Sequence, residues 1–255
     1  MLLQPDMPYT EFRPNLRLQQ FVECYWCVKS ATQLSSFRPV FPDACSDVIF
    51  NFSAPLLYEE HGKISCNKFQ SFYVGIQTAP IFTKAGGATD LLGVRFKNQG
   101  AWRFLRRPLA EFSNKTASLK ELDEGDLHNL TEQMAFLPVS ERINLIELRL
   151  LERLGNESQY DLVDQFFNRP SESIHAFCKA NHLSERTLER KSRERVGVSP
   201  KMYQRIVRFR KASGKLSGFD GSLMEFAWDM GYYDHAHLAK DFREFGHFLP
   251  SSLMH

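Results

Sequence analysis

The sequence predicts an α+β fold with two domains: a β-rich N-terminal domain ending in linking helices, and an all-α C-terminal domain. Three observations support this. Short runs of β-branched and aromatic residues fill the first hundred positions. A helical apolar pattern covers residues 140–154. Beyond Pro170 every segment has the length and apolar spacing of a short helix. At 255 residues the chain has room for two modest domains.

The predicted strands of the N-terminal domain alternate with loops that contain Pro, Gly or Asn. The clearest runs are SDVIFNF (46–52), KFQSFYVGI (68–76) and LLGVRF (91–96). Their spacing is typical of a sandwich or a barrel, and a cupin-like barrel is among the folds we expect.

A helix is predicted over 140–154, with Ser140 as N-cap. Its apolar stripe consists of Ile143, Ile146, Leu150 and Leu154. This stripe can pair two protomers in a homodimer, or it can pack on the β-domain, and the sequence leaves both open. The polar stretch that follows is broken by Gly155 and Pro170, so we place the domains at 1–155 and 156–255.

A basic helix is predicted in SERTLERKSRERVGVSP, residues 184–200. Ser184 is the expected N-cap, Gly197 ends the helix, and Pro200 fits the first turn of a further helix reaching about residue 213. That further helix has an expected inner stripe of Met202, Ile206 and Phe209. The basic helix carries one continuous polar face at helical spacing, made of Arg186, Glu189, Arg190 and Arg193.

The C-terminal region contains an internal repeat. Ser173 and Phe177 correspond to Ser222 and Phe226 at an offset of 49 residues. After the turn the offset is 50, as in Leu188 with Leu238, Arg190 with Lys240, and Pro200 with Pro250. Two helix-turn-helix units joined by a helix follow from this self-similarity.

A helix-turn-helix places its second helix in the major groove of double-stranded DNA. Residues 184–215 hold 11 Lys or Arg against 3 Asp or Glu, although the net charge of the whole chain is only +2. Concentrated positive charge fits a polyanionic partner. A solvated basic face explains the charge alone equally well, but it does not explain the repeat.

At these residues the chain resembles the AraC/XylS family of bacterial transcription regulators. The segments LSERTLERKSRERVGVSPKMYQRIVRFRKA and MGYYDHAHLAKDFREF carry the resemblance, which covers roughly the last 85 residues. It implies a seven-helix domain with recognition helices at about 184–196 and 234–245, in successive major grooves. The residues it implies at the DNA are Ser184, Arg186, Thr187, Glu189, Arg190, Arg193, His235, Ala236, Ala239, Lys240 and Arg243.

Two residues depart from the family pattern. Ser192 occupies the position of a core phenylalanine that Phe242 keeps in the second unit. His247 occupies the position of a turn glycine, so we expect the second unit to end differently from the first. Glu189 has two open roles, accepting from a cytosine amino group or pairing with Arg193 or Arg186.

The N-terminal half resembles the sensor regions of some AraC-like regulators in FVECYW (21–26) and FPDACSDVIFNFS (41–53), with Ala44 in place of a turn glycine. The resemblance implies a small-molecule effector or protomer pairing, with DNA affinity or RNA polymerase contact as the output.

Other classes are less favoured by the sequence. A cupin-like enzyme needs clustered histidines, and residues 1–130 contain only two. A four-cysteine zinc site from Cys24, Cys27, Cys45 and Cys66 would fit a methyl-accepting DNA-repair regulator. However, a CxxC motif on a strand points its thiols to opposite faces. We therefore expect no metal or other cofactor and no catalysis. A non-specific architectural DNA binder stays open.

No apolar run approaches the roughly 18 residues of a membrane span. The N-terminus lacks a signal-peptide pattern. We therefore expect a cytoplasmic protein with no membrane contact.

Overall fold

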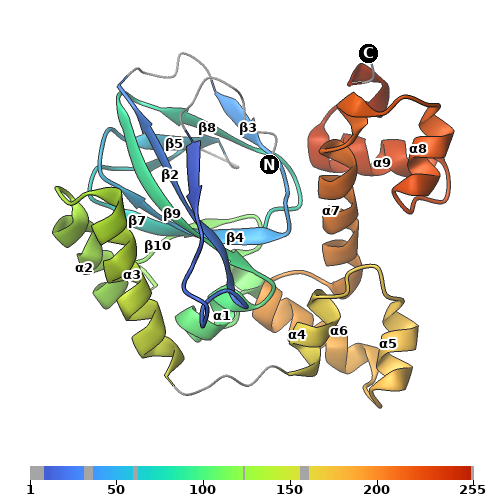
Figure 1. Ribbon diagram of the computed structural model, residues 1–255, viewed down its shortest axis with the longest axis horizontal. Helices are drawn as coiled ribbons and strands as arrows, with labels where there is room; N and C mark the ends of the chain where they lie inside the picture. Colours follow the sequence, from blue (N-terminus) through green and yellow to red (C-terminus); the bar gives the residue numbers. More distant parts are fainter. Residues whose placement is uncertain (1–8, 32–36, 60–62, 123, 156–160, 254–255) are drawn as a thin grey trace.

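The computed structural model describes residues 9–31, 37–59, 63–122, 124–155 and 161–253. An α+β architecture with a β-rich N-terminal part and a helical C-terminal part is confirmed (Figure 1). The strands are β1 (Tyr9–Phe12), β2 (Val22–Ser30), β3 (Arg38–Val40), β4 (Cys45–Asn51), β5 (Leu56–Glu59), β6 (Lys63–Cys66), β7 (Ser71–Val74), β8 (Ile81–Ala85), β9 (Thr89–Lys97) and β10 (Thr116–Ser118). The three runs named from the sequence overlap β4, β7 and β9, respectively.

The strands form two antiparallel sheets. One has six strands in the order β1-β2-β9-β4-β7-β10, and the other has four in the order β3-β8-β5-β6. In the larger sheet β9 lies between β2 and β4, with Val94 opposite both Tyr25 and Val48. Among the described residues no strand pairing joins the two sheets, so the expected closed, cupin-like barrel is not formed and the sandwich alternative fits.

Alternation along the strands gives the domain two apolar layers. In β2 the side chains of Cys24 and Trp26 enter the core between the two sheets, whereas Val22 and Tyr25 enter a core on the opposite face. That opposite face is covered by helices α1 (Gly100–Leu105), α2 (Gly125–Met134) and α3 (Val139–Leu154) (Figure 1).

Helix α3 uses its apolar stripe to bind its own β-domain. Ile143, Ile146, Leu150 and Leu154 are all buried in the core on the sheet. The stripe therefore is not free to pair protomers, which excludes that form of the homodimer hypothesis. The N-cap lies two residues earlier than expected: it is Pro138, and Ser140 lies exposed in the first turn.

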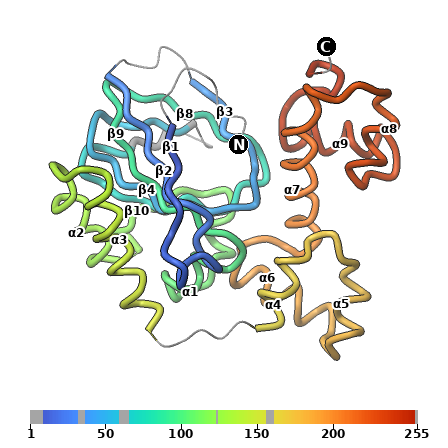
Figure 2. The backbone as a smooth tube through the Cα atoms, viewed as in Figure 1, coloured from blue at the N-terminus to red at the C-terminus, as the bar shows by residue number. Residues whose placement is uncertain are grey.

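The C-terminal part holds two short helical units at the two ends of one longer helix, α7 (Figures 1 and 2). Its elements are α4 (Leu162–Phe167), α5 (Ile174–Ala180), α6 (Glu185–Val196), α7 (Pro200–Ser213), η2 (Leu216–Gly218), α8 (Leu223–Asp229), α9 (His235–Gly246) and η3 (Pro250–Ser252). Within residues 161–253 there are six α-helices and two 3₁₀ helices, so the implied seventh α-helix is not among them.

Helix termini reproduce the repeat read from the sequence. Helices α5 and α8 both have seven residues and serine N-caps, Ser173 and Ser222. Helices α6 and α9 both have 12 residues, begin after Ser184 and Asp234, and end at a left-handed residue. The extra residue lies in the second turn. Each helix-turn-helix therefore uses the same local capping chemistry at equivalent positions.

The inner face of α7 differs at one place from the expected stripe. Ile206 and Phe209 are fully buried, but Met202 is only half-buried and Tyr203 takes the inner position. Phe209 contacts Phe242 and Phe245 of α9, at ring-centroid distances of 5.1 and 5.5 Å. None of the helices in the described part of the chain is long and apolar enough to cross a membrane.

Candidate nucleic-acid interface

Helix α6 is the centre of the candidate interface, and local chemistry fixes where it starts and stops. The Ser184 hydroxyl accepts a hydrogen bond from the Thr187 amide at 3.1 Å, and the two hydroxyls lie 2.8 Å apart. At the other end Gly197 has φ of +99°, a conformation that glycine adopts without strain. Leu188, Ser192 and Val196 face inward, which leaves the opposite side to solvent.

The outer side of α6 carries the arginines named from the sequence. Arg186 is exposed, and no ion pair joins it to another described residue. Arg190 and Arg193 expose 67% and 59% of their side chains. These three residues are therefore available to an external anion.

Ion pairs along the helix hold two of these arginines. Glu189 accepts from Arg193 at 2.9 Å, and Glu194 pairs with Arg190 at 3.3 Å. Exposed pairs at this spacing contribute only about 0.3–0.5 kcal/mol, so a phosphate or a guanine can replace the carboxylate at small cost. In the free protein Glu189 thus pairs with Arg193, which is the second of the two roles expected for it.

Helix α9 presents a different outer surface at the same positions. His235, Ala236, Lys240 and Arg243 are exposed and Ala239 is half-buried. Asp234 caps the helix by accepting from the His237 amide at 2.7 Å. Beside this end of α9, Trp228 donates its indole N–H to the Tyr233 carbonyl at 3.2 Å, and the two rings are 61% and 85% exposed.

A charged cluster fixes α9 against α7. Asp241 is fully buried, and its Oδ1 accepts from Nε and Nη2 of Arg205 at 3.0 and 2.7 Å. Arg205 also donates to Glu244, which holds the pKa of that carboxyl below its usual range. Arg208 lies 3.7 Å from the other oxygen of Asp241. This cluster was not found from the sequence, although a charged residue between Leu238 and Phe242 on the inner face was a visible signal.

Both departures from the family pattern have structural explanations. Ser192 is fully buried and donates its hydroxyl to the Val198 carbonyl at 2.6 Å, so its hydrogen bond closes the turn after α6. His247 adopts φ of +61°, the conformation of the glycine it replaces. The expectation that the second unit ends differently is therefore wrong. Instead, it ends alike, at the cost of placing a non-glycine residue in the left-handed region.

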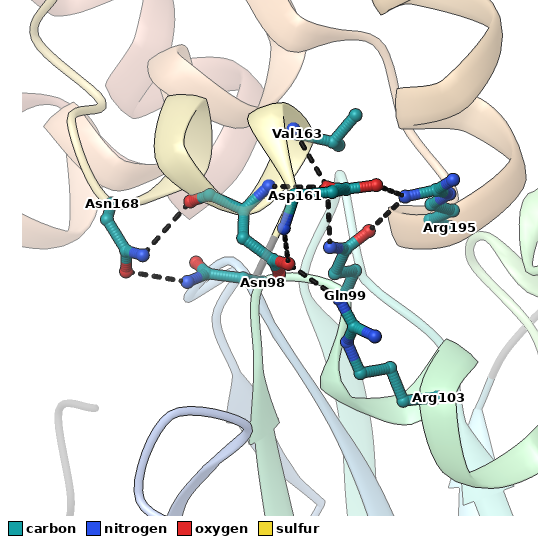
Figure 3. Close-up of polar contacts among 8 residues, drawn as sticks. Asn98, Gln99, Arg103, Asp161, Val163, Asn168 and Arg195 are labelled. Carbon is teal, nitrogen blue, oxygen red and sulfur yellow. Dashed lines mark hydrogen bonds and ion pairs between the residues drawn. The ribbon is translucent and has the colours of Figure 1, made fainter. Parts of the chain in front are cut away.

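The far side of α6 attaches to the N-terminal domain (Figure 3). Arg195 pairs with Asp161, donates to Gln99 at 3.2 Å, and stacks on Trp102 with its guanidinium carbon 4.4 Å from the ring centroid. Only 14% of the Arg195 side chain is exposed. Arg195 of the basic helix therefore binds protein. Its position on the side of the helix opposite Arg186 is the sequence signal that distinguishes it from the exposed arginines.

Neighbouring contacts extend this attachment. Arg103 of α1 donates to Asp164 of α4 at 2.7 Å, and Asn98 donates to Asn168 at 2.9 Å (Figure 3). The Leu109 amide donates to the backbone carbonyl of Glu194 in α6 at 2.7 Å. Burial alone would raise the pKa of Asp161, but its hydrogen bond and ion pair with Arg195 outweigh burial and lower it.

A second attachment lies along α7. Arg210 pairs with Glu23 of β2 at 2.7 Å and donates to the Asp43 carbonyl at 3.2 Å. Burial of Glu23 is outweighed by Arg210, so the pKa of this carboxyl is lowered. Ala44 in the adjoining turn has φ of +64° and is buried in the C-terminal core together with Ile76. The turn that resembles a sensor motif is therefore part of the joint between the two halves.

The cysteines are separated by the fold. Cys24 enters the core between the sheets, whereas Cys27 packs on the opposite face, as expected for a CxxC motif on a strand. Burial raises the pKa of the Cys24 and Cys66 thiols to about 12, which disfavours the thiolate that a zinc ion or a methyl acceptor needs. No group of three or more His, Cys, Asp or Glu in the described ranges could hold a metal ion.

Comparison with known proteins agrees with this geometry. Residues 177–255 match a family described as a helix-turn-helix domain, and residues 10–118 match a domain of unknown function, DUF6597. The AraC-family transcriptional activator RhaR of Yersinia pestis is 30% identical over 159 residues. The C-terminal region is an AraC-type double helix-turn-helix domain.

The relatives with this AraC-type domain are longer than the matched part. The match to RhaR covers 54% of this chain and 50% of that protein. The transcriptional activator RhaS of Pectobacterium carotovorum is 26% identical over 167 residues, which cover 62% of this chain and 58% of the relative. The chain therefore spans between half and three fifths of the length of these relatives.

The solved structures that resemble this chain are more distant in sequence. ToxT of Vibrio cholerae is 10% identical with a TM-score of 0.46, covering 89% of this chain and 97% of ToxT. The AraC-like transcriptional activator CuxR is 12% identical with a TM-score of 0.27, covering 88% of this chain and 99% of CuxR.

Proposed function

We propose that this protein is a transcription regulator that binds double-stranded DNA through both helix-turn-helix units. The observation that carries the proposal is the exposed row of Arg186, Arg190 and Arg193 on α6, on the side away from the N-terminal domain. Guanidinium groups bond guanine bidentately and also bind phosphate. Binding, with no catalytic step, is the proposed mechanism.

The eleven residues named from the sequence divide into three proposed roles. Ser184 and Thr187, at the N-terminus of α6, lie where backbone amides and hydroxyls reach phosphate. Arg186, Glu189, Arg190 and Arg193 contact bases or phosphates in the first segment of the site. His235, Ala236, Ala239, Lys240 and Arg243 face a second segment, with Lys240 and Arg243 supplying charge.

The division of the chain at 155/156 remains part of the proposal. It lies at the edge of residues 156–160, which are outside the described residues. In this scheme residues 1–155 sense an effector or a partner, and residues 156–255 bind DNA. Contacts of Arg195 and Arg210 with the N-terminal domain offer a route by which a small-molecule effector changes DNA affinity or RNA polymerase contact.

A footprint on selected duplex DNA tests the proposal. Sites are selected from random duplexes with the full chain, and protection is then measured with excess random DNA present. We expect two protected major-groove segments about one helical turn apart. Equal affinity for every duplex would instead identify a non-specific architectural protein, and absence of binding to any duplex contradicts the proposal.

A further inference from the structure

The two recognition helices are aligned residue for residue by their caps. Asp234 and His247 bound α9 as Ser184 and Gly197 bound α6, at a constant offset of 50 residues. Position 186 of α6 therefore corresponds to 236 of α9, and position 189 to 239.

The equivalent positions differ in chemistry in a consistent way. Arg186 and Glu189, a hydrogen-bond donor and an acceptor, are replaced in α9 by the methyl groups of Ala236 and Ala239. The basic positions are kept, since Lys240 and Arg243 correspond to Arg190 and Arg193. Helix α9 thus keeps charge for phosphate but has no hydrogen-bonding side chain at either position.

A second difference lies outside the recognition helices. Trp228 of α8 corresponds to Lys179 of α5 at the offset of 49 and is 61% exposed. Tyr233, whose carbonyl accepts from the Trp228 indole, is 85% exposed. Two exposed aromatic residues therefore precede the N-cap of α9, and the first unit has an exposed lysine at the position of Trp228.

We infer that α9 reads thymine by contact between the side chains of Ala236 and Ala239 and the C5-methyl groups in the major groove. The inference rests on the proposed function and deepens it. Thymine is the base that presents a methyl group in this groove, and alanine is among the side chains that recognise it. Side chains at i and i+3 lie about 5–6 Å apart, which matches one to two base steps of about 3.4 Å.

Deoxyuridine tests the inference, because it removes the thymine methyl and leaves every hydrogen-bonding group in place. The operator comes from the selection above. The selection is repeated with Arg190→Ala. The operator segment whose base preference stays the same is assigned to α9, because Arg190 belongs to α6. Affinity of the full chain is then measured for operators carrying deoxyuridine in one segment at a time. Each methyl removed opposite α9 is expected to weaken binding about fourfold.

The same substitution opposite α6 is the DNA control, and affinity there should change by less than about twofold, because Arg186 and Glu189 present no methyl group. On the protein side, Ala236→Gly and Ala239→Gly should abolish the deoxyuridine effect. Ala176→Gly, at an exposed position in α5, is the matched control for the lower helix propensity of glycine and should leave that effect intact.

Two results overturn the inference while the proposed function stands. One is unchanged affinity on deoxyuridine opposite α9, in a chain that still selects its operator over random DNA. The other is a full deoxyuridine effect in both glycine variants, which would place the methyl contact elsewhere. Failure to select any operator contradicts the proposed function itself.

Discussion

Two arginines of α6 that are five residues apart, Arg190 and Arg195, have opposite roles. Arg190 is 67% exposed and held only by Glu194, whereas Arg195 is 14% exposed and held by Asp161, Gln99 and Trp102. The difference is angular, since a residue advances by 100° around a helix of 3.6 residues per turn. Charge counts along a sequence cannot separate the two roles, but position on the helix face can.

Arg190→Ala separates base reading from phosphate binding. If Arg190 bonds a guanine, its loss should cost about 1–3 kcal/mol on the selected operator and far less on random duplex. The measurement is a titration of both DNAs at one salt concentration. An equal loss on the two DNAs would show that Arg190 contacts phosphate. Lys191→Ala, a neighbouring charge off the groove face, is the control and should affect both DNAs weakly and equally.

Helices and their ends were the most predictable elements. The cap at Ser184 and the limits of α7 were predicted, because capping depends on a few neighbouring residues. Ser173 and Ser222 were matched to each other in the repeat but were not assigned as caps. The N-cap of α3 was missed by two residues, since Pro138 serves as cap and Ser140 does not. The other strands, β1, β2, β3, β5, β6, β8 and β10, were not named individually, because their pairing depends on partners distant in sequence.

The α7–α9 packing depends on a buried carboxylate. Arg205→Ala leaves Asp241, which is fully buried, without its main partner, and should reduce the free energy of unfolding by about 3–5 kcal/mol. Urea denaturation of the full chain measures this. Arg205→Met combined with Asp241→Leu should recover much of the loss, because it removes the buried charge together with its partner.

Lys211→Ala is the matched control on α7, since Lys211 is exposed and should change stability by no more than about 0.5 kcal/mol. A loss in Arg205→Ala no larger than this control would mean that solvent reaches Asp241, and the cluster would then have no role in fixing α9.

The two halves of the chain are joined more closely than the sequence indicated. The sequence separated a β-rich part from a helical part, which is confirmed. Nothing in it predicted that Ile76 and Ala44 would enter the helical core, or that the Leu109 amide would bind a carbonyl of α6. Contacts between segments so distant in sequence have no periodic signature.

Acid should weaken this joint over a defined pH range. The pKa values of Glu23 and Asp161 are lowered in the folded chain, so their stabilising contribution is present above the unfolded values of about 4.3 and 3.9. It is lost as the pH falls through the lower folded values. The contribution of these two carboxylates to stability should therefore be nearly constant between pH 5 and 8 and should decline below about pH 4.

The measurement is the urea midpoint of the full chain as a function of pH. Glu23→Gln should flatten the acid decline and lower stability at neutral pH, because Arg210 loses its ionised partner. Glu132→Gln, an exposed position on α2, should leave the pH dependence unchanged. An acid decline as steep in Glu23→Gln as in the parent chain would contradict the assignment.

The burial of Ile76 and Ala44 beneath the helical units has a practical consequence for anyone cutting this chain. A fragment beginning near residue 161 would lack two members of the apolar cluster that contains Val198 and Tyr203. It would also lose Gln99 and Trp102 as partners of Arg195, and Glu23 as the partner of Arg210. We therefore expect such a fragment to aggregate or to refold poorly. A fusion of the helix-turn-helix units to another sensor domain would also need the segments that contact them: the turn at 41–45, the loop at 98–99 and the surface of α1.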